Sequence, residues 1–168
     1  MTSGKQRGKI LLLTMLTGDV LTSGLVDIHE PSGEFVCSFG GGVFKWARDI
    51  TATCDGRVMI VDRDDGSLYI FDVEGHQLDK FNINHERDFY YRIACHPASA
   101  DRVVLAGCEL ETGGLTLAIY TVYGEFVRRI QLDGKVYYNV HGITVTVEGH
   151  IAVAFDDGSF AKAKVIVV

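Results

Sequence analysis

The sequence predicts an all-β fold built from repeated units of four short strands, and two observations carry that prediction. First, residues 49–81 contain three turn signals, at 55–56, 64–67 and 74–75, which separate four short apolar runs. Second, the two halves of this unit recur elsewhere in the chain. A repeat of about 40 to 50 residues that holds four strands is typical of a β-propeller blade.

The recurrence can be followed residue by residue. Residues 142–155 superpose on residues 49–62 without a gap, and residues 26–39 and 117–130 both superpose on residues 68–81. These superpositions place three glycines at one turn position: Gly33, Gly75 and Gly124. We expect a positive φ angle at each of them, a conformation that glycine adopts at little cost.

The best-preserved unit also carries a family resemblance. It reads Ile-x-x-x-x-Asp-Gly-x-Val-x-Ile-Val-Asp, followed by Leu-Tyr-Ile-Phe-Asp-x-x-Gly-x-x-Leu-x-x-Phe. This pattern resembles the NHL repeat, best known from the C-terminal propellers of tripartite-motif (TRIM) ubiquitin ligases. The other copies are degenerate but in register, so the resemblance covers most of the chain. The resemblance implies a propeller of about six blades. Three interpretations of this chain stay open: a part of a larger ring, a divergent short relative, or a compact four-bladed ring.

Taken in order, the chain begins with a polar segment, residues 1–8, that we expect to be frayed. Four blades follow, and the first and the last are incomplete. The blades span residues 9–40, 45–83, 90–132 and 140–168, and we expect three, four, four and three strands in them. The repeat places the run 9–16 on a second strand, so we expect the first blade to lack its innermost strand. We expect the last blade to lack its outermost strand. In the third blade, the extra length falls into a two-residue insertion within 96–102 and a loop at 107–114.

Incomplete blades leave strand edges unpaired, and unpaired edges attract other strands. The last run ends in Val165, Ile166, Val167 and Val168, whose β-branched side chains favour strand pairing, whereas Lys162 and Lys164 oppose it. We therefore expect one of two outcomes. The first and last strands pair and close the ring, or the chain associates with itself through them.

Composition narrows the class of function. The 168 residues are 47% hydrophobic and carry a formal net charge of −6, which does not indicate a globally basic nucleic-acid binder. The four cysteines, Cys37, Cys54, Cys95 and Cys108, lack metal-site spacing and are expected to be buried free thiols. The apolar run at 10–16 is too short to span a bilayer. These features predict a cytoplasmic protein without a membrane partner.

One face of the predicted propeller combines aromatic and cationic side chains, because the segments before three first strands lie on it. Such a combination suits an extended peptide or single-stranded RNA. Packing of the aromatic rings between blades is the structural alternative. The candidate binding residues are Lys45, Trp46, Arg48, Phe89, Tyr90, Tyr91, Arg92, Tyr137, Tyr138, Asn139 and His141. The acidic residues Asp62, Asp64, Asp65, Asp156 and Asp157 are expected near the same face and favour a protein ligand over RNA.

The resemblance and this face together predict a noncatalytic module that recruits protein substrates, as in a TRIM-type ligase. No RING or B-box cysteine pattern occurs, so ubiquitin transfer itself is not expected of this chain. Single-stranded RNA binding is the alternative hypothesis. A third hypothesis is a metal-dependent lyase of the NHL-like type, with His141 at the channel, but the other histidines fall on other strands or turns. We expect no cofactor and no metal ligand set.

Overall fold

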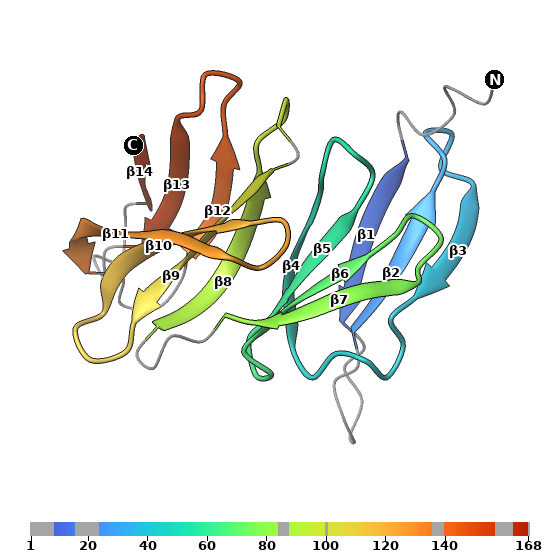
Figure 1. Cartoon of the computed structure of the whole chain (residues 1–168), viewed down its shortest axis with the longest axis horizontal. Helices are drawn as coiled ribbons and strands as arrows, with labels where there is room; N and C mark the ends of the chain where they lie inside the picture. The colour runs from blue at the N-terminus through green and yellow to red at the C-terminus, as the bar shows by residue number, and fades with distance from the viewer. Residues whose placement is uncertain are drawn as a thin grey trace.

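The computed structural model describes residues 9–15, 24–83, 88–99, 101–135, 140–156 and 163–167, and they form fourteen strands in four antiparallel sheets (Figure 1). The sheets hold three, four, four and three strands, so the predicted β-propeller blades and their strand counts are confirmed. Within the described residues, there is no helix and therefore none that could cross a membrane.

The strands are β1 (Ile10–Met15), β2 (Gly24–His29), β3 (Phe35–Phe39), β4 (Ala47–Ala52), β5 (Val58–Asp62), β6 (Ser67–Phe71), β7 (Gln77–Asn82), β8 (Asp88–Cys95), β9 (Arg102–Glu109), β10 (Gly114–Thr121), β11 (Phe126–Lys135), β12 (Val140–Val145), β13 (Ile151–Asp156) and β14 (Ala163–Val167).

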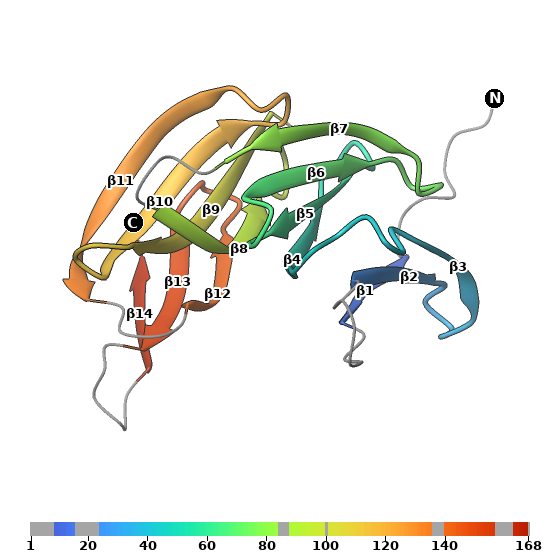
Figure 2. The same ribbon diagram turned by 90° about the horizontal axis from the view of Figure 1, so that it is seen from below.

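Each sheet is a meander in which strands that follow one another in sequence are paired. The four sheets are arranged side by side around a common inner side (Figures 1 and 2). The first strands of successive blades, β4, β8 and β12, contact one another and form the inner wall. The last strands, β7 and β11, lie outermost, and β7 is largely exposed. This arrangement brings the N-terminal ends of three first strands together, where the candidate site lies.

The core consists of three layers, one between each pair of neighbouring blades. Alternation along the middle strands of the second blade creates two of these layers. Val58 and Ile60 face the first blade, whereas Met59 and Val61 face the third. All five residues of β5 and of β6 are buried, as a sheet packed on both faces requires.

Five hairpin turns share one geometry. In each, the fourth residue is a glycine with φ between +84° and +91°, whose N–H donates to the carbonyl of the first residue. The turns begin at Glu30, Thr53, Asp72, Thr121 and Thr146. The positive φ expected at Gly33, Gly75 and Gly124 is confirmed, at +88°, +88° and +84°.

Three expectations about the chain need correction, and a fourth lies outside the described residues. Among the described strands, β1 pairs with β2 and β14 with β13, so the first and last strands do not close a ring by pairing. In the third blade, the expected loop at 107–114 is shorter than predicted, because β9 continues to Glu109 and β10 begins at Gly114, with Leu115 paired to Cys108. Cys54 is exposed in a turn, not buried in a strand. The expected frayed segment 1–8 lies outside the described residues.

Candidate active site

The candidate site is formed by three equivalent β-bulges at the start of the inner strands. In β4 the register passes from Ala47 to Asp49, in β8 from Tyr90 to Arg92, and in β12 from Val140 to Gly142. Each bulge leaves one residue out of the ladder: Arg48, Tyr91 or His141. Bulges redirect a side chain and often lie beside active sites.

Each bulged residue has a partner at the equivalent place on, or directly after, the second strand of its blade. The three pairs are Arg48 with Arg63, Tyr91 with Cys108, and His141 with Asp156. We call these six residues the bulge site. The same backbone position therefore carries different chemistry in each blade.

In the second blade, the bulge site holds two guanidinium groups among aromatic rings. The Cζ of Arg48 lies 5.8 Å from the ring centre of Trp46 and 5.7 Å from that of Tyr91. The Cζ of Arg63 lies 5.7, 5.3 and 5.5 Å from the ring centres of Trp46, Phe89 and Tyr91. Burial lowers the pKa of Arg48, and the positive charges of Arg92 and Arg63 lower it further.

In the third blade, the bulge site is neutral. The hydroxyl of Tyr91 lies 3.4 Å from Sγ of Cys108, and the ring is 9% exposed. Burial, together with this hydrogen bond, raises the pKa of Tyr91 to about 12. The side chain is therefore a protonated hydroxyl at neutral pH and can donate a hydrogen bond.

In the fourth blade, the bulge site holds an imidazole and a carboxylate. Nε2 of His141 lies 2.8 Å from Oδ2 of Asp156, and both side chains are open to solvent, at 47% and 42% exposure. A carboxylate that accepts the N–H of one ring nitrogen leaves the other nitrogen with a free lone pair. This pair has the composition of a general base and the group that orients it.

Arg92, directly after the bulged Tyr91 of the third blade, links the second, third and fourth blades. Its Nε donates to the carbonyl of His141 at 2.9 Å, and its Nη1 donates to the carbonyl of Arg48 at 3.0 Å. Oδ2 of Asp49 accepts the N–H of Ile93 at 3.0 Å, which adds a second link between the second and third blades. Burial raises the pKa of Asp49. These bonds fix the relative positions of the bulges.

A polar groove of about 560 Å³ runs along the inner strands β4, β8 and β12. Asp49, Arg92 and His141 contribute to its walls, and Thr51, Cys95 and Thr144 lie further along the same strands. Of the pair in the fourth blade, His141 therefore lines a space that a small molecule can enter.

The structure brings most of the predicted face together but reassigns some of its members. Trp46, 38% exposed, and Arg48, Phe89, Tyr91 and His141 lie at or beside the bulge site. The prediction that Tyr90 lies on the surface is wrong, because the strand ladder continues through this residue and turns its ring inward, where it is 2% exposed. Its hydroxyl donates to Oδ2 of Asp88 at 3.2 Å. Tyr137, Tyr138 and Asn139 lie outside the described residues.

Two further predicted residues have structural contacts. The ammonium of Lys45 pairs with Asp65 at 3.0 Å. Asp62 is not part of an acidic surface, because it is fully buried and accepts the N–H groups of Lys45, Trp46 and Asp65. Arg63, Cys108 and Asp156 were missing from the predicted set of binding residues. Extending the gapless match of residues 142–155 by one residue at each end aligns Arg48 with His141 and Arg63 with Asp156, so a signal for two of them was present.

The side chains that could bind a metal ion are few at this site. Within the described ranges, no group of three or more His, Cys, Asp or Glu side chains is placed to hold one. His141 and Asp156 supply two donors of this kind. The described residues therefore do not provide the ligand set that a metal-dependent lyase of the NHL-like type implies.

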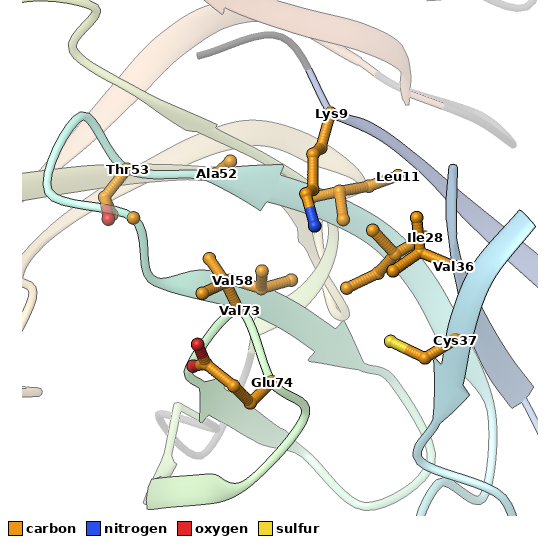
Figure 3. A pocket seen from close by; sticks show the side chains of 11 residues that line it. Lys9, Leu11, Ile28, Val36, Cys37, Ala52, Thr53, Val58, Val73 and Glu74 are labelled. Carbon is orange, nitrogen blue, oxygen red and sulfur yellow. The ribbon is translucent and has the colours of Figure 1, made fainter. Parts of the chain in front are cut away.

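A second cavity, of about 490 Å³, lies between the first and second blades (Figure 3). Its walls are mostly apolar, with Leu11 and Ile28 from the first blade facing Val58 and Val73 from the second. Lys9 extends its side chain into this cavity. The cavity contains no paired acid and base of the kind seen at the bulge site.

No protein-family model matches the chain, and no curated protein is similar to it in sequence. Solved structures do resemble it. A protein of unknown function from Bacteroides caccae has a TM-score of 0.62 at 12% identity, and the match covers 94% of this chain and 56% of that one. Virginiamycin B lyase from Staphylococcus aureus has a TM-score of 0.53 at 13% identity, with 95% and 59% covered.

A catalytically inactive variant of that lyase with quinupristin, in which a histidine is replaced by alanine, has a TM-score of 0.52 at 13% identity, with 95% and 60% covered. At these identities the likeness shows the fold, a β-propeller. The chain spans less than two thirds of the length of each of these structures.

The comparisons correct the functional prediction. The named neighbours are lyases, which are enzymes, so the predicted noncatalytic role is contradicted. Nothing in these comparisons supports recruitment of substrates for a TRIM-type ubiquitin ligase, and nothing supports the RNA-binding alternative. The resemblance to NHL repeats therefore predicted the propeller fold but not the class of function, since one fold hosts many functions.

Proposed function

We propose that this propeller is an enzyme of the lyase class and that the bulge site is its catalytic centre. The observation that carries the proposal is the 2.8 Å contact between Nε2 of His141 and Oδ2 of Asp156, both solvent-accessible, with His141 lining the inner groove. The named structural neighbours, which are lyases of the same fold, support it.

The proposed reaction is an elimination next to a carbonyl group. The free ring nitrogen of His141 takes a proton from the carbon beside the carbonyl. The electron pair of that C–H bond forms a carbon–carbon double bond, and the leaving group departs with its electron pair from the adjacent carbon. Asp156 holds the imidazole in the required tautomer and stabilises the imidazolium that forms. His141 then returns the proton to the leaving group.

The other two blades would bind the substrate. The hydroxyl of Tyr91, a protonated donor at the bulge of the third blade, would stabilise the negative charge that develops on the carbonyl oxygen, and the arginines of the second blade would hold the rest of the substrate. A hydrogen-bond donor fixed in place before the reaction lowers the barrier for a step that builds up an oxyanion. Arg92 acts as a positioning residue, because its donors are bonded to the backbone at two bulges.

Turnover of virginiamycin B and of quinupristin, followed by liquid chromatography, tests this proposal. His141→Ala should lower the rate by about 10²–10⁴-fold, the usual contribution of a general base. Asp156→Asn should lower it less, because the imidazole remains. His150→Ala is the matched control, since this exposed histidine lies in a turn of the same blade, and its rate should match the unmodified chain. A rate that survives His141→Ala contradicts the proposal.

A further inference from the structure

Arg48 and Arg63 form a pair of like charges without a counter-ion among the described residues. Each guanidinium is half-buried, and both lie over the rings of Trp46 and Tyr91 at 5.5 to 5.8 Å. The Nε atoms of both are buried and have no hydrogen-bond partner in the described part of the chain. The charge of Asp64 reaches Arg48, but Asp64 is exposed and forms no ion pair with it there.

This arrangement is energetically costly in the free protein. A buried donor without a partner destabilises the fold, and more so when the group is charged. Two guanidinium groups that share the same rings also repel each other, which is consistent with the lowered pKa of Arg48. Contact with aromatic rings offsets part of this cost. An anion placed against both groups would offset it further.

The neighbouring arginine shows what a structural role looks like in the same site. Arg92 places its donors on the carbonyls of Arg48 and His141, so its hydrogen bonds are used within the fold. No such bonds fix Arg48 and Arg63 within the described residues. Their guanidinium planes carry donors in a fork that matches the oxygens of a carboxylate or a phosphate.

We propose that Arg48 and Arg63 bind an oxyanion group, a carboxylate or a phosphate, that is part of the substrate. This inference rests on the proposed function and names the class of substrate: a small molecule with an anionic group at one end and the eliminated bond at the other. The partly exposed ring of Trp46 provides a flat wall beside the anion. The anion lies at the second blade and the reacting carbon at His141 in the fourth, and Arg92 between them bonds to the backbone carbonyls of Arg48 and His141.

Trp46 makes the proposal directly measurable, because it is the single tryptophan of the chain and both guanidinium groups lie over it. Its fluorescence is followed while the full chain is titrated with sodium phosphate and, separately, with sodium acetate. Sodium chloride at matched ionic strength serves as the blank. We expect a saturable change with at least one of the two anions, at concentrations roughly in the millimolar range or below, as befits a small ion.

Variants identify the residues that bind. Arg48→Met and Arg63→Met should each weaken the response at least about tenfold, and Arg48→Lys, which keeps the charge but loses the fork, should weaken it less. The control Arg102→Met removes an exposed arginine of the third blade and should leave the response unchanged. If a methionine variant fails to fold, the arginine Nε–H signals of the unmodified chain in NMR provide the same test, since those of Arg48 and Arg63 should shift on addition of the anion.

Each outcome decides one question. Saturation by phosphate alone or by acetate alone supports the site and identifies its oxyanion. A response equal to that of chloride, or one that persists in both methionine variants, overturns the inference. His141→Ala should retain the anion response, so loss of turnover in that variant and loss of anion binding in Arg48→Met are separate failures. Turnover that depends on His141 without any anion response would overturn this inference alone.

Discussion

Gly75 and Gly33 occupy the same turn position with the same φ of +88°, but their surroundings differ. A Cβ built on Gly75 would lie 2.6 Å from Cβ and 2.7 Å from Cγ of Phe39, in the outer strand of the preceding blade. A Cβ built on Gly33 meets nothing within 4 Å. The two positions therefore separate the cost of backbone conformation from the cost of packing between blades.

The expected magnitudes follow from these distances. An alanine with positive φ costs roughly 1–2 kcal/mol at either position. At Gly75 the added methyl also meets the Cβ of Phe39, which moves only if β3 moves, because that atom is bonded to the backbone. Phe39 is held in turn against Phe71, with ring centres 4.9 Å apart. Overpacking of this kind costs about 1–3 kcal/mol. We therefore expect Gly33→Ala to destabilise the fold by about 1–2 kcal/mol and Gly75→Ala by about 2–5 kcal/mol.

Gly124 completes the series. A Cβ there would lie 2.3 to 2.6 Å from ring atoms of Phe81, which stands in the outer strand of the second blade as Phe39 does in that of the first. A ring can rotate away where a backbone-bound atom cannot, so Gly124→Ala should fall between the other two. Phe81→Ala removes these ring atoms, and combining it with Gly124→Ala should recover about 1 kcal/mol relative to additivity.

Urea unfolding followed by circular dichroism measures these free energies. All three substitutions restrict the unfolded chain equally, so that effect cancels in the comparison. Equal destabilisation by Gly33→Ala and Gly75→Ala, within about 0.5 kcal/mol, would refute the packing argument. A small effect of Gly33→Ala would instead show that the turn accepts another residue.

Two further predictions concern charged side chains. Arg92→Met should lower the free energy of unfolding by about 2–3 kcal/mol, because it leaves the backbone carbonyls of His141, Arg48 and Tyr91 without a charged donor. Arg102→Met should change the free energy of unfolding by less than about 0.5 kcal/mol. Equal values in urea unfolding would mean that the bridge between blades contributes nothing. Contacts with Lys80, Lys45 and the Tyr69 hydroxyl hold the pKa of Asp65 well below its usual range. Its carboxylate therefore stabilises the fold at a pH above its unfolded-state pKa of about 4. This stabilisation is lost as the pH falls through the lower pKa of the folded state. Asp65→Asn should therefore lower stability by about 1 kcal/mol at pH 7, and the difference should shrink towards about pH 2; a difference independent of pH in thermal unfolding would rule out this ion pairing as its cause.

The blade pattern could be predicted from the sequence because turn chemistry and alternation agree in the best-preserved copy, residues 49–81. Val58 to Val61 alternate between two core layers, and Gly56, Gly66 and Gly75, each with a positive φ, stand in the three predicted turns. The ends of the β9–β10 hairpin could not be predicted in the same way. Pairing there continues through Gly107 and Cys108, residues that carry no strand preference of their own.

Half of the bulge site was among the predicted binding residues and half was not, and strand register is the reason. Aromatic and cationic residues before the first strands marked Trp46, Arg48, Tyr91 and His141. Their partners on the second strands depend on which residue the bulge skips, and a shift of one position sends a side chain to the opposite face. The same ambiguity explains Tyr90, which stands one position before the bulged Tyr91 and points into the core.

The charge of the bulge site changes from positive to negative between the second blade and the fourth. Because the backbone is the same in three blades, the chemistry changes only through the side chains. It runs from two cations in the second blade, through the neutral Tyr91 and Cys108 in the third, to the imidazole and carboxylate of the fourth. An anionic substrate in the groove would be attracted to the second blade and repelled by Asp156. In the proposed enzyme, these two forces orient the molecule so that its uncharged, reacting end lies at His141, and Arg92 preserves that spacing by holding the carbonyls of both outer bulges.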